Sequence, residues 1–221
     1  MSAQRLSPVQ PEGFDFTAEN LAWAEKEIEK YPAGKKQSAV MPLLWRAQRQ
    51  NDGWVSEPAM RVIAVMLDMA YVRVYEVATF YTMFNLKPVG RYHVQLCGTT
   101  PCWLRGADDL KKTCRDHIGP KGVTSDDGLF TWTEVECLGA CVNAPVVQIN
   151  NDFYEDLDTN NLLKLIDGIR RGLSPKPGSA RARTSSEPEG GATTLTDQKL
   201  YDPQTAAVPI NLASRDGKVS E

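Results

Sequence analysis

The sequence predicts an α+β protein in which a small helical bundle is followed by an α/β domain and an extended C-terminal tail. Apolar residues recur at helical spacing in residues 15–87, after an N-terminal extension of residues 1–14. Apolar and polar residues then alternate with a period of two in short runs of residues 88–173, which indicates strands. Residues 174–221 are rich in Pro, Ser, Gly, Thr, Arg and Glu, so this low-complexity tail has too little apolar surface to fold alone.

Capping residues and prolines divide the first region into four short helices. Thr17 can cap the first helix, and Pro32 ends it. Ser56 can cap the third, where Pro58 falls in the first turn and is tolerated. Short connections between these helices favour a bundle. The expected helices cover approximately residues 17–31, 38–53, 56–67 and 74–84.

The second region predicts the order strand, helix, strand, strand, strand, helix. Thr99 or Thr100 can cap the first of its helices, and Thr159 the last. Pro145 stands at the start of a strand, where a missing N–H is tolerated. This order favours a small α/β sandwich. The expected strands are residues 92–97, 130–135, 145–150 and 153–155, and the expected helices are residues 99–117 and 159–172.

Composition limits the functions that the chain can have. It has 221 residues, of which 42% are hydrophobic and 24% charged, as in a globular protein of one or two domains. A net charge of −3 without a basic stripe argues against a nucleic-acid partner. No run approaches the roughly 18 apolar residues of a membrane span, so we expect no direct membrane insertion. The N-terminus resembles neither a secretory signal nor a transit peptide.

Four cysteines in two close pairs are the main functional signal. Four residues separate Cys97 from Cys102, and three separate Cys137 from Cys141. Each pair follows a predicted strand and spans a loop that contains glycine. Cysteines without a secretory signal favour a metal or free thiols over disulfides. Soft thiolate ligands favour an iron–sulfur cluster, zinc or Cu(I).

The spacing leaves a [2Fe–2S] cluster and a structural zinc ion open. Zinc commonly takes ligand pairs with two to four intervening residues, which includes both spacings here. The domain has enough alternating apolar residues to fold without a metal, which favours the cluster. Cys114 lies on the apolar stripe of its helix and is interpreted as a packing residue. No GxGxxG motif or P-loop is visible, so the chain is predicted to carry a one-electron centre without a substrate site.

Three segments resemble one family. They are Tyr75–Phe84, the loop from Cys97 to Cys102, and the loop from Cys137 to Pro145. Together they are similar to the thioredoxin-like [2Fe–2S] subunits, the E subunits, in the NADH-oxidising module of bacterial NADH:quinone oxidoreductase, respiratory complex I. The resemblance covers residues from about 15 to 173 and leaves the tail uncovered.

The resemblance implies a thioredoxin-like α/β domain and one [2Fe–2S] cluster with Cys97, Cys102, Cys137 and Cys141 as ligands. It also implies a partner subunit that binds FMN and NADH, other peripheral-arm partners, and a place on the cytoplasmic side of the bacterial inner membrane. The chain itself would pass single electrons and bind neither NADH nor FMN. Equivalent subunits of an NAD-linked hydrogenase or formate dehydrogenase remain alternatives, as does a structural zinc scaffold.

Two surfaces are expected to meet partners. In the last helix of the bundle, aromatic residues are divided between the core and a face that could meet the flavin subunit. In the tail, apolar residues gather near the far end, so the tail is either a solvated appendage or a partner-binding arm. This apolar group comprises Tyr201, Val208, Pro209, Ile210 and Leu212.

Overall fold

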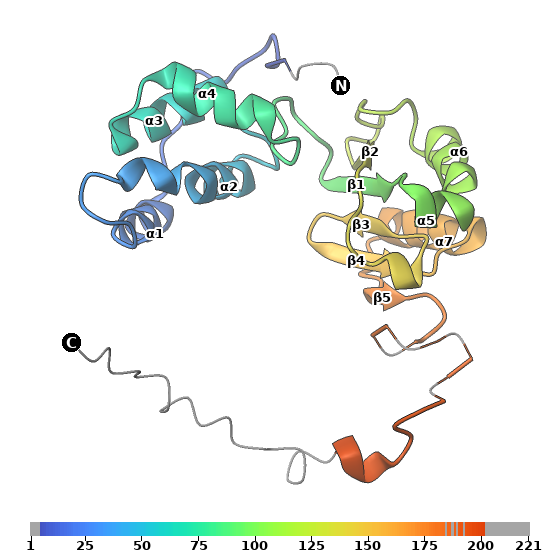
Figure 1. The fold of residues 1–221 in the computed structure, drawn as a ribbon. Helices are drawn as coiled ribbons and strands as arrows, with labels where there is room; N and C mark the ends of the chain where they lie inside the picture. The colour runs from blue at the N-terminus through green and yellow to red at the C-terminus, as the bar shows by residue number, and fades with distance from the viewer. Residues whose placement is uncertain (1–4, 184, 187, 189, 192, 202–221) are drawn as a thin grey trace, which may run out of the picture. The chain divides into compact units, whose positions relative to one another are not determined.

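A computed structural model describes residues 5–201, apart from residues 184, 187, 189 and 192. The chain divides into two units, residues 1–182 and 183–221. Figure 1 shows the helices and strands of the first unit, α1 to α7 and β1 to β5. In the second unit the described residues form one 3-10 turn, Gln198–Tyr201. The apolar group predicted near residues 208–212 lies outside the described residues.

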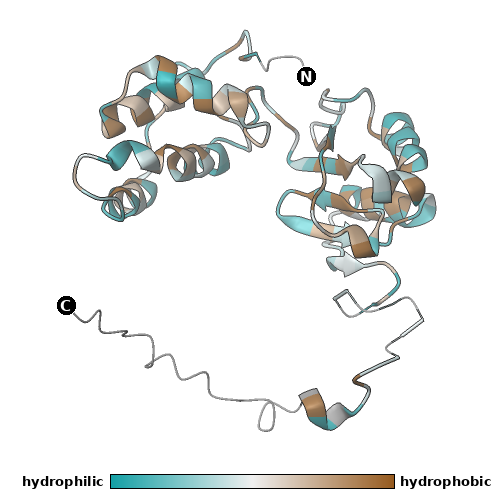
Figure 2. Cartoon of the chain, viewed as in Figure 1, coloured by the Kyte–Doolittle hydropathy of each residue, from teal (hydrophilic) through white to brown (hydrophobic). Residues whose placement is uncertain are grey.

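The N-terminal region contains the four predicted helices. Thr17 caps α1 by accepting the backbone N–H of Asn20 at 3.2 Å, and Ser56 caps α3 by accepting that of Ala59 at 3.4 Å. The amphipathic pattern is visible in Figure 2, where hydrophilic and hydrophobic residues share each helix. The helices are α1 (Ala18–Ile28), α2 (Val40–Gln50), α3 (Glu57–Leu67) and α4 (Tyr71–Phe80).

Two of these helices differ from the predicted boundaries. Ser38 lies in a 3-10 turn, Lys36–Ala39, and the α-helix begins after it. Helix α4 begins three residues earlier and ends four residues earlier than expected, so Phe84 lies in the following turn. Phe84 is fully buried there, whereas Phe80 is 76% exposed. The core of this region includes Leu43, Leu44, Met60, Ile63, Leu67 and Phe84.

The second region is a mixed sheet in the order β2-β1-β3-β4-β5. The pair β1–β2 is parallel, β1–β3 and β3–β4 are antiparallel, and β4–β5 is parallel. Helix α6 packs against β1 and beside α7. The strands are β1 (Tyr92–Cys97), β2 (Phe130–Val135), β3 (Val147–Ile149), β4 (Asp152–Glu155) and β5 (Gly178–Ser179). The helices are α5 (Thr100–Leu104), α6 (Ala107–His117) and α7 (Thr159–Arg170).

The first two strands have the predicted boundaries, because alternation of apolar residues marks them clearly. The helix expected over residues 99–117 is divided instead, because Gly106 takes a φ of 99° between α5 and α6. The cap of α7 is Asp158, not Thr159: its carboxylate accepts the backbone N–H of Asn161 at 2.7 Å.

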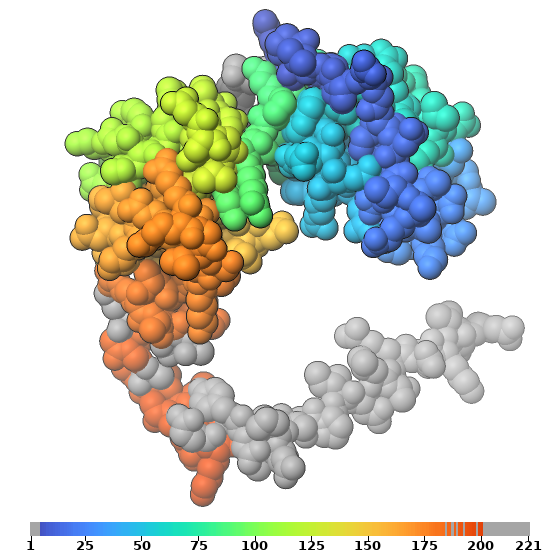
Figure 3. Space-filling model, turned by 180° about the vertical axis from the view of Figure 1, so that it is seen from behind, coloured from blue at the N-terminus to red at the C-terminus, as the bar shows by residue number. Residues whose placement is uncertain are grey.

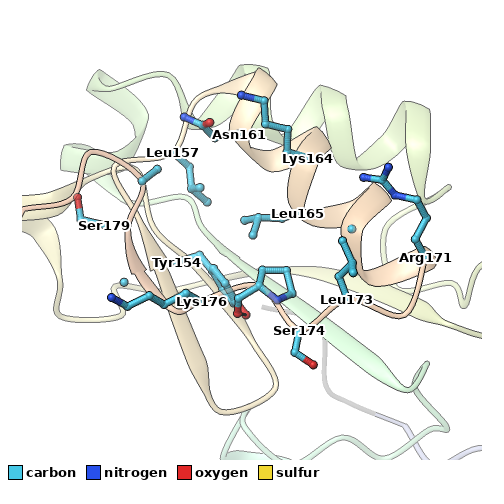
Figure 4. A pocket seen from close by; sticks show the side chains of 14 residues that line it. Tyr154, Leu157, Asn161, Lys164, Leu165, Arg171, Leu173, Ser174, Lys176 and Ser179 are labelled. Carbon is cyan, nitrogen blue, oxygen red and sulfur yellow. Dashed lines mark hydrogen bonds between the residues drawn. The ribbon is translucent and has the colours of Figure 1, made fainter.

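The segment after α7, which we expected in the tail, is packed on the sheet domain. Ser179 of β5 donates its hydroxyl to Asp156 at 2.5 Å, and the Tyr154 hydroxyl donates to the carbonyl of Pro175 at 3.2 Å. Figure 3 shows this segment and α7, both orange, as one continuous surface. The two enclose a cavity of about 520 Å³. Leu165 points into this cavity, and the charged end of Arg171 lies at its margin (Figure 4).

In the part of the chain that the structure describes, every helix is too short and too polar to cross a membrane.

Candidate metal centre

The parallel pair β1–β2 brings the two cysteine loops to the same edge of the sheet. Cys97 is the last residue of β1 and lies opposite Val135, the last residue of β2. Gly98 continues this pairing by donating its N–H to the Val135 carbonyl at 3.3 Å. Cys102 lies in α5, and Cys141 begins a 3-10 turn, Cys141–Asn143. Since parallel neighbours end at the same edge, the loops that follow the two strands meet there.

The thiol groups of each pair lie next to one another. The sulfur atoms of Cys137 and Cys141 are 3.3 Å apart. Cys97 and Cys102 interact through their side chains, and Cys97 also shifts the pKa values of Cys137 and Cys141. The structure therefore brings the four predicted residues into one site.

Hydrogen-bond donors surround two of the sulfur atoms. The Thr99 hydroxyl lies 3.3 Å from the sulfur of Cys97, and the backbone N–H of Gly139 donates to the sulfur of Cys137 at 3.4 Å. Sequence patterns singled out neither donor. Their positions depend on how each loop turns, although a glycine or threonine two residues after a cysteine was a usable signal.

The environment separates the pKa values within each pair. Burial opposes ionisation of Cys97, but hydrogen bonds from Thr99, Cys102 and Leu138 together lower its pKa. Burial and the hydrogen bond with Cys97 raise the pKa of Cys102 to about 12. The Gly139 N–H lowers the pKa of Cys137, and the hydrogen bond with Cys137 raises that of Cys141. Each pair thus contains one thiol that ionises readily and a second that shares its proton.

The site is half enclosed. Cys97 and Cys102 are each 1% exposed, whereas Cys137 is exposed and Cys141 is partly exposed. A group held by all four would be covered by the first pair and open to solvent or to a partner on the side of the second.

The arrangement fits a binuclear cluster better than a single ion. Among the described residues, no three His, Cys, Asp or Glu side chains converge as the ligands of one metal ion would. A structural zinc ion needs four ligands around one point. A [2Fe–2S] cluster needs two ligands at each of two irons, which two adjacent pairs can provide. The geometry therefore favours the cluster.

The remaining candidates lie apart from this donor set. Cys114 is fully buried in the core on α6, and burial raises the pKa of its thiol to about 12. His93 is buried within β1, and His117 ends α6 on the surface.

A small α/β domain with paired cysteine loops at the shared end of two parallel strands defines a class, the iron–sulfur electron carriers. Residues 24–170 match the family described as thioredoxin-like [2Fe-2S] ferredoxin, and the chain belongs to this family. The match confirms the predicted fold class, a helical N-terminal region followed by a thioredoxin-like domain. Membership of the family implies one [2Fe–2S] cluster.

Curated relatives agree on one protein, the E subunit of NADH-quinone oxidoreductase. The first of two such subunits in Rhizobium meliloti (strain 1021) is 48% identical over 239 residues, which cover 100% of this chain and 86% of the relative. The corresponding protein of Rickettsia conorii is 58% identical over 158 residues, which cover 71% of this chain and 95% of the relative.

Among solved structures, an NAD+-reducing [NiFe]-hydrogenase in the H2-reduced state matches 60% of this chain with a TM-score of 0.52. At 21% sequence identity, this likeness shows the fold alone, and the match spans 23% of that hydrogenase chain.

Proposed function

We propose that this chain is the electron-transfer subunit of the NADH-oxidising module of NADH:quinone oxidoreductase. One observation carries the proposal: two thiol pairs meet at the shared end of β1 and β2, in a chain that is 48% identical along its whole length to an NADH-quinone oxidoreductase E subunit. The oxidoreductase activity belongs to the complex, and the chain supplies one redox centre to it.

Cys97, Cys102, Cys137 and Cys141 are proposed to hold a [2Fe–2S] cluster, which takes up and passes on one electron at a time. The chain's own groups prepare the site. The Thr99 hydroxyl and the Gly139 N–H donate to ligand sulfur atoms and stabilise their negative charge. The buried first pair limits access of water to one side.

The proposed partner is a subunit that binds FMN and NADH, in the peripheral arm on the cytoplasmic side of the bacterial inner membrane. Large apolar side chains next to the cysteines support a partner surface there. Trp103 is 54% exposed, Leu104 is 70% exposed and Val142 is 63% exposed. Apolar residues around a redox centre let a partner approach closely and exclude water.

The alternatives are equivalent subunits of an NAD-linked hydrogenase or formate dehydrogenase. The hydrogenase has an observation in its favour, the shared fold. Its 21% identity is much lower than the 48% and 58% of the quinone oxidoreductase subunits, and this difference favours the first proposal.

The test is to purify the full chain and measure its metal content, visible absorption and electron paramagnetic resonance (EPR) spectrum after reduction by dithionite. We expect two irons and two sulfides per chain and a signal from one reduced [2Fe–2S] cluster. A colourless protein with one zinc would overturn the proposal in favour of a zinc scaffold.

A second measurement tests the division of labour between subunits. The chain alone should not transfer electrons from NADH to ferricyanide, and activity should appear when the flavin subunit is added. Steady NADH oxidation by the flavin-free chain would show a nucleotide site that we have missed.

A further inference from the structure

A carboxylate lies one residue from the first thiol of the site. Glu134 occupies the second-last position of β2, opposite Leu96, and Cys97 follows Leu96 in β1. Its side chain covers the backbone of Gly98, so that a Cβ atom added to Gly98 would overlap the carboxylate oxygen Oε1. Glycine therefore permits a close approach between this carboxylate and the start of the loop that holds Cys97 and Cys102.

Lysine side chains hold the carboxylate in place. Nζ of Lys111, on α6, lies 2.6 Å from Oε1 of Glu134 and 3.1 Å from Oδ1 of Asp108. Nζ of Lys121 lies 3.6 Å from the other Glu134 oxygen. The Lys111 side chain is 18% exposed and that of Lys121 is 57% exposed, so Lys111 is the better-shielded partner.

The same network reaches the second thiol of the first pair. The indole N–H of Trp103, the residue after Cys102, donates to Oδ2 of Asp108 at 2.8 Å. A chain of contacts thus runs from Trp103 through Asp108 and Lys111 to Glu134. It joins the two ends of the cysteine loop through two carboxylates and an ammonium group.

Both members of the central pair are charged at neutral pH. The hydrogen bond with Lys111 lowers the pKa of Glu134, and the hydrogen bond with Glu134 raises the pKa of Lys111. Removing either member would therefore leave the other charge uncompensated.

We propose that Glu134 and Lys111 are positioning residues whose charges tune the reduction potential of the group held by Cys97, Glu134 lowering the potential and Lys111 raising it. The proposal rests on the proposed [2Fe–2S] function. Reduction adds one negative charge, so a nearby anion opposes it and a nearby cation favours it. One residue separates Gly98 from the ligand sulfur's own backbone, well inside the screening length of about 8–10 Å at ordinary salt.

A purely structural role predicts something different. In that case the pair only fastens α6 to the end of β2, and losing either partner would disturb the loop in the same way. An electrostatic role instead predicts potential shifts of opposite sign for the two substitutions. Partly exposed ion pairs contribute little to folding, so both variants should fold.

The experiment is a redox titration of the full-length chain with dithionite as the one-electron reductant, followed by EPR. Glu134→Gln keeps the side-chain shape and should raise the midpoint potential, Lys111→Met should lower it, and the double variant should fall between them. Lys112→Met is the matched control, because Lys112 is the next residue of α6 and is exposed. Its potential should equal that of the wild type, and added salt should shrink the shifts of the single variants.

Shifts of the same sign, or shifts no larger than that of Lys112→Met, would overturn the tuning proposal while leaving the proposed function intact. Absence of a cluster signal in the wild type would overturn both. If Glu134→Gln fails to retain the cluster, Lys111→Met and the charge-preserving Lys111→Arg still decide: the first must lower the potential and the second must restore it.

Discussion

Nε2 of His93 lies 2.9 Å from the hydroxyl oxygen of Thr133, on the neighbouring strand of the parallel pair. The other ring nitrogen of His93 lies 3.5 Å from the side-chain amide of Asn85, in the connection that precedes β1. His93 is buried, and this burial lowers its pKa from 6.5 to about 4.

His93 is therefore predicted to make the stability of the protein depend on pH. Below pH 6.5 the unfolded chain binds a proton at His93, while the folded chain stays neutral until about pH 4. The free energy of unfolding should therefore fall as the pH is lowered through this window, with a contribution of about 1–2 kcal/mol at pH 5.

Urea unfolding of wild type and His93→Gln at pH 7.5 and pH 5 measures this contribution. The variant should lose less stability between the two pH values than the wild type, whatever its stability at pH 7.5. His117→Gln is the control, because His117 lies on the surface at the end of α6. Equal pH dependence in wild type and His93→Gln would contradict the prediction.

Each of the four clustered cysteines is predicted to be necessary for a normal [2Fe–2S] signal. Replacing Cys97, Cys102, Cys137 or Cys141 by Ser exchanges a soft sulfur ligand for a harder oxygen, which should abolish or alter the signal. The EPR spectrum of each dithionite-reduced variant gives the answer. An unchanged spectrum in any variant removes that residue from the ligand set.

Cys114 is predicted to be dispensable for the metal centre. It is fully buried among the core side chains of the sheet domain. Cys114→Ala should keep the iron content and cost about 1 kcal/mol or less of stability, because only one sulfur atom leaves the core. Iron analysis and urea unfolding test the two statements separately. Loss of iron from this variant would show that Cys114 takes part in binding.

The sequence predicts the strands that carry the site more accurately than the helices around them. Strands β1 and β2 have the predicted ends because their apolar residues alternate over six positions. The division at Gly106 was missed, because one glycine inside a helical pattern does not reveal its φ. Strand β5 has only Gly178 and Ser179, and no two-residue pattern can predict it. Its pairing depends on contacts with β4.

For the site, spacing identifies which cysteines come together but not how they differ. The burial of Cys97 and Cys102, and the exposure of Cys137, follow from how α5 and the second loop lie on the end of the sheet. The approach of Glu134 to Gly98 depends on strand register. Such contacts between strands are set by tertiary structure, which single-residue patterns do not contain.

Gly90 is predicted to tolerate no side chain. Its N–H donates to the Thr131 hydroxyl at 2.7 Å, and a Cβ atom would lie 2.6 Å from the backbone carbon of Phe130. Since strand backbone cannot move aside as a flexible side chain can, Gly90→Ala should lower the free energy of unfolding by about 1–3 kcal/mol. Gly13→Ala is the control, because a Cβ there would meet no atom within 4 Å. Equal stability of the two variants would contradict the prediction.

The C-terminal arm is best tested by two truncations, because the segment after α7 belongs to the folded domain. Ending the chain after Gly172 would remove β5, the Pro175 carbonyl that accepts from Tyr154, and part of the cavity wall. That truncation should lower thermal stability, whereas ending the chain after Ala182 should leave both stability and iron content unchanged.

The truncation after Ala182 therefore isolates the role of residues 183–221 in assembly. If the apolar group near residues 208–212 docks on a partner, its loss lowers the effective concentration of the remaining contacts. The truncated chain should then leave the flavin subunit and the rest of the complex at lower salt and detergent concentrations than the full chain. Equal retention of both chains would reject the arm and favour a solvated appendage.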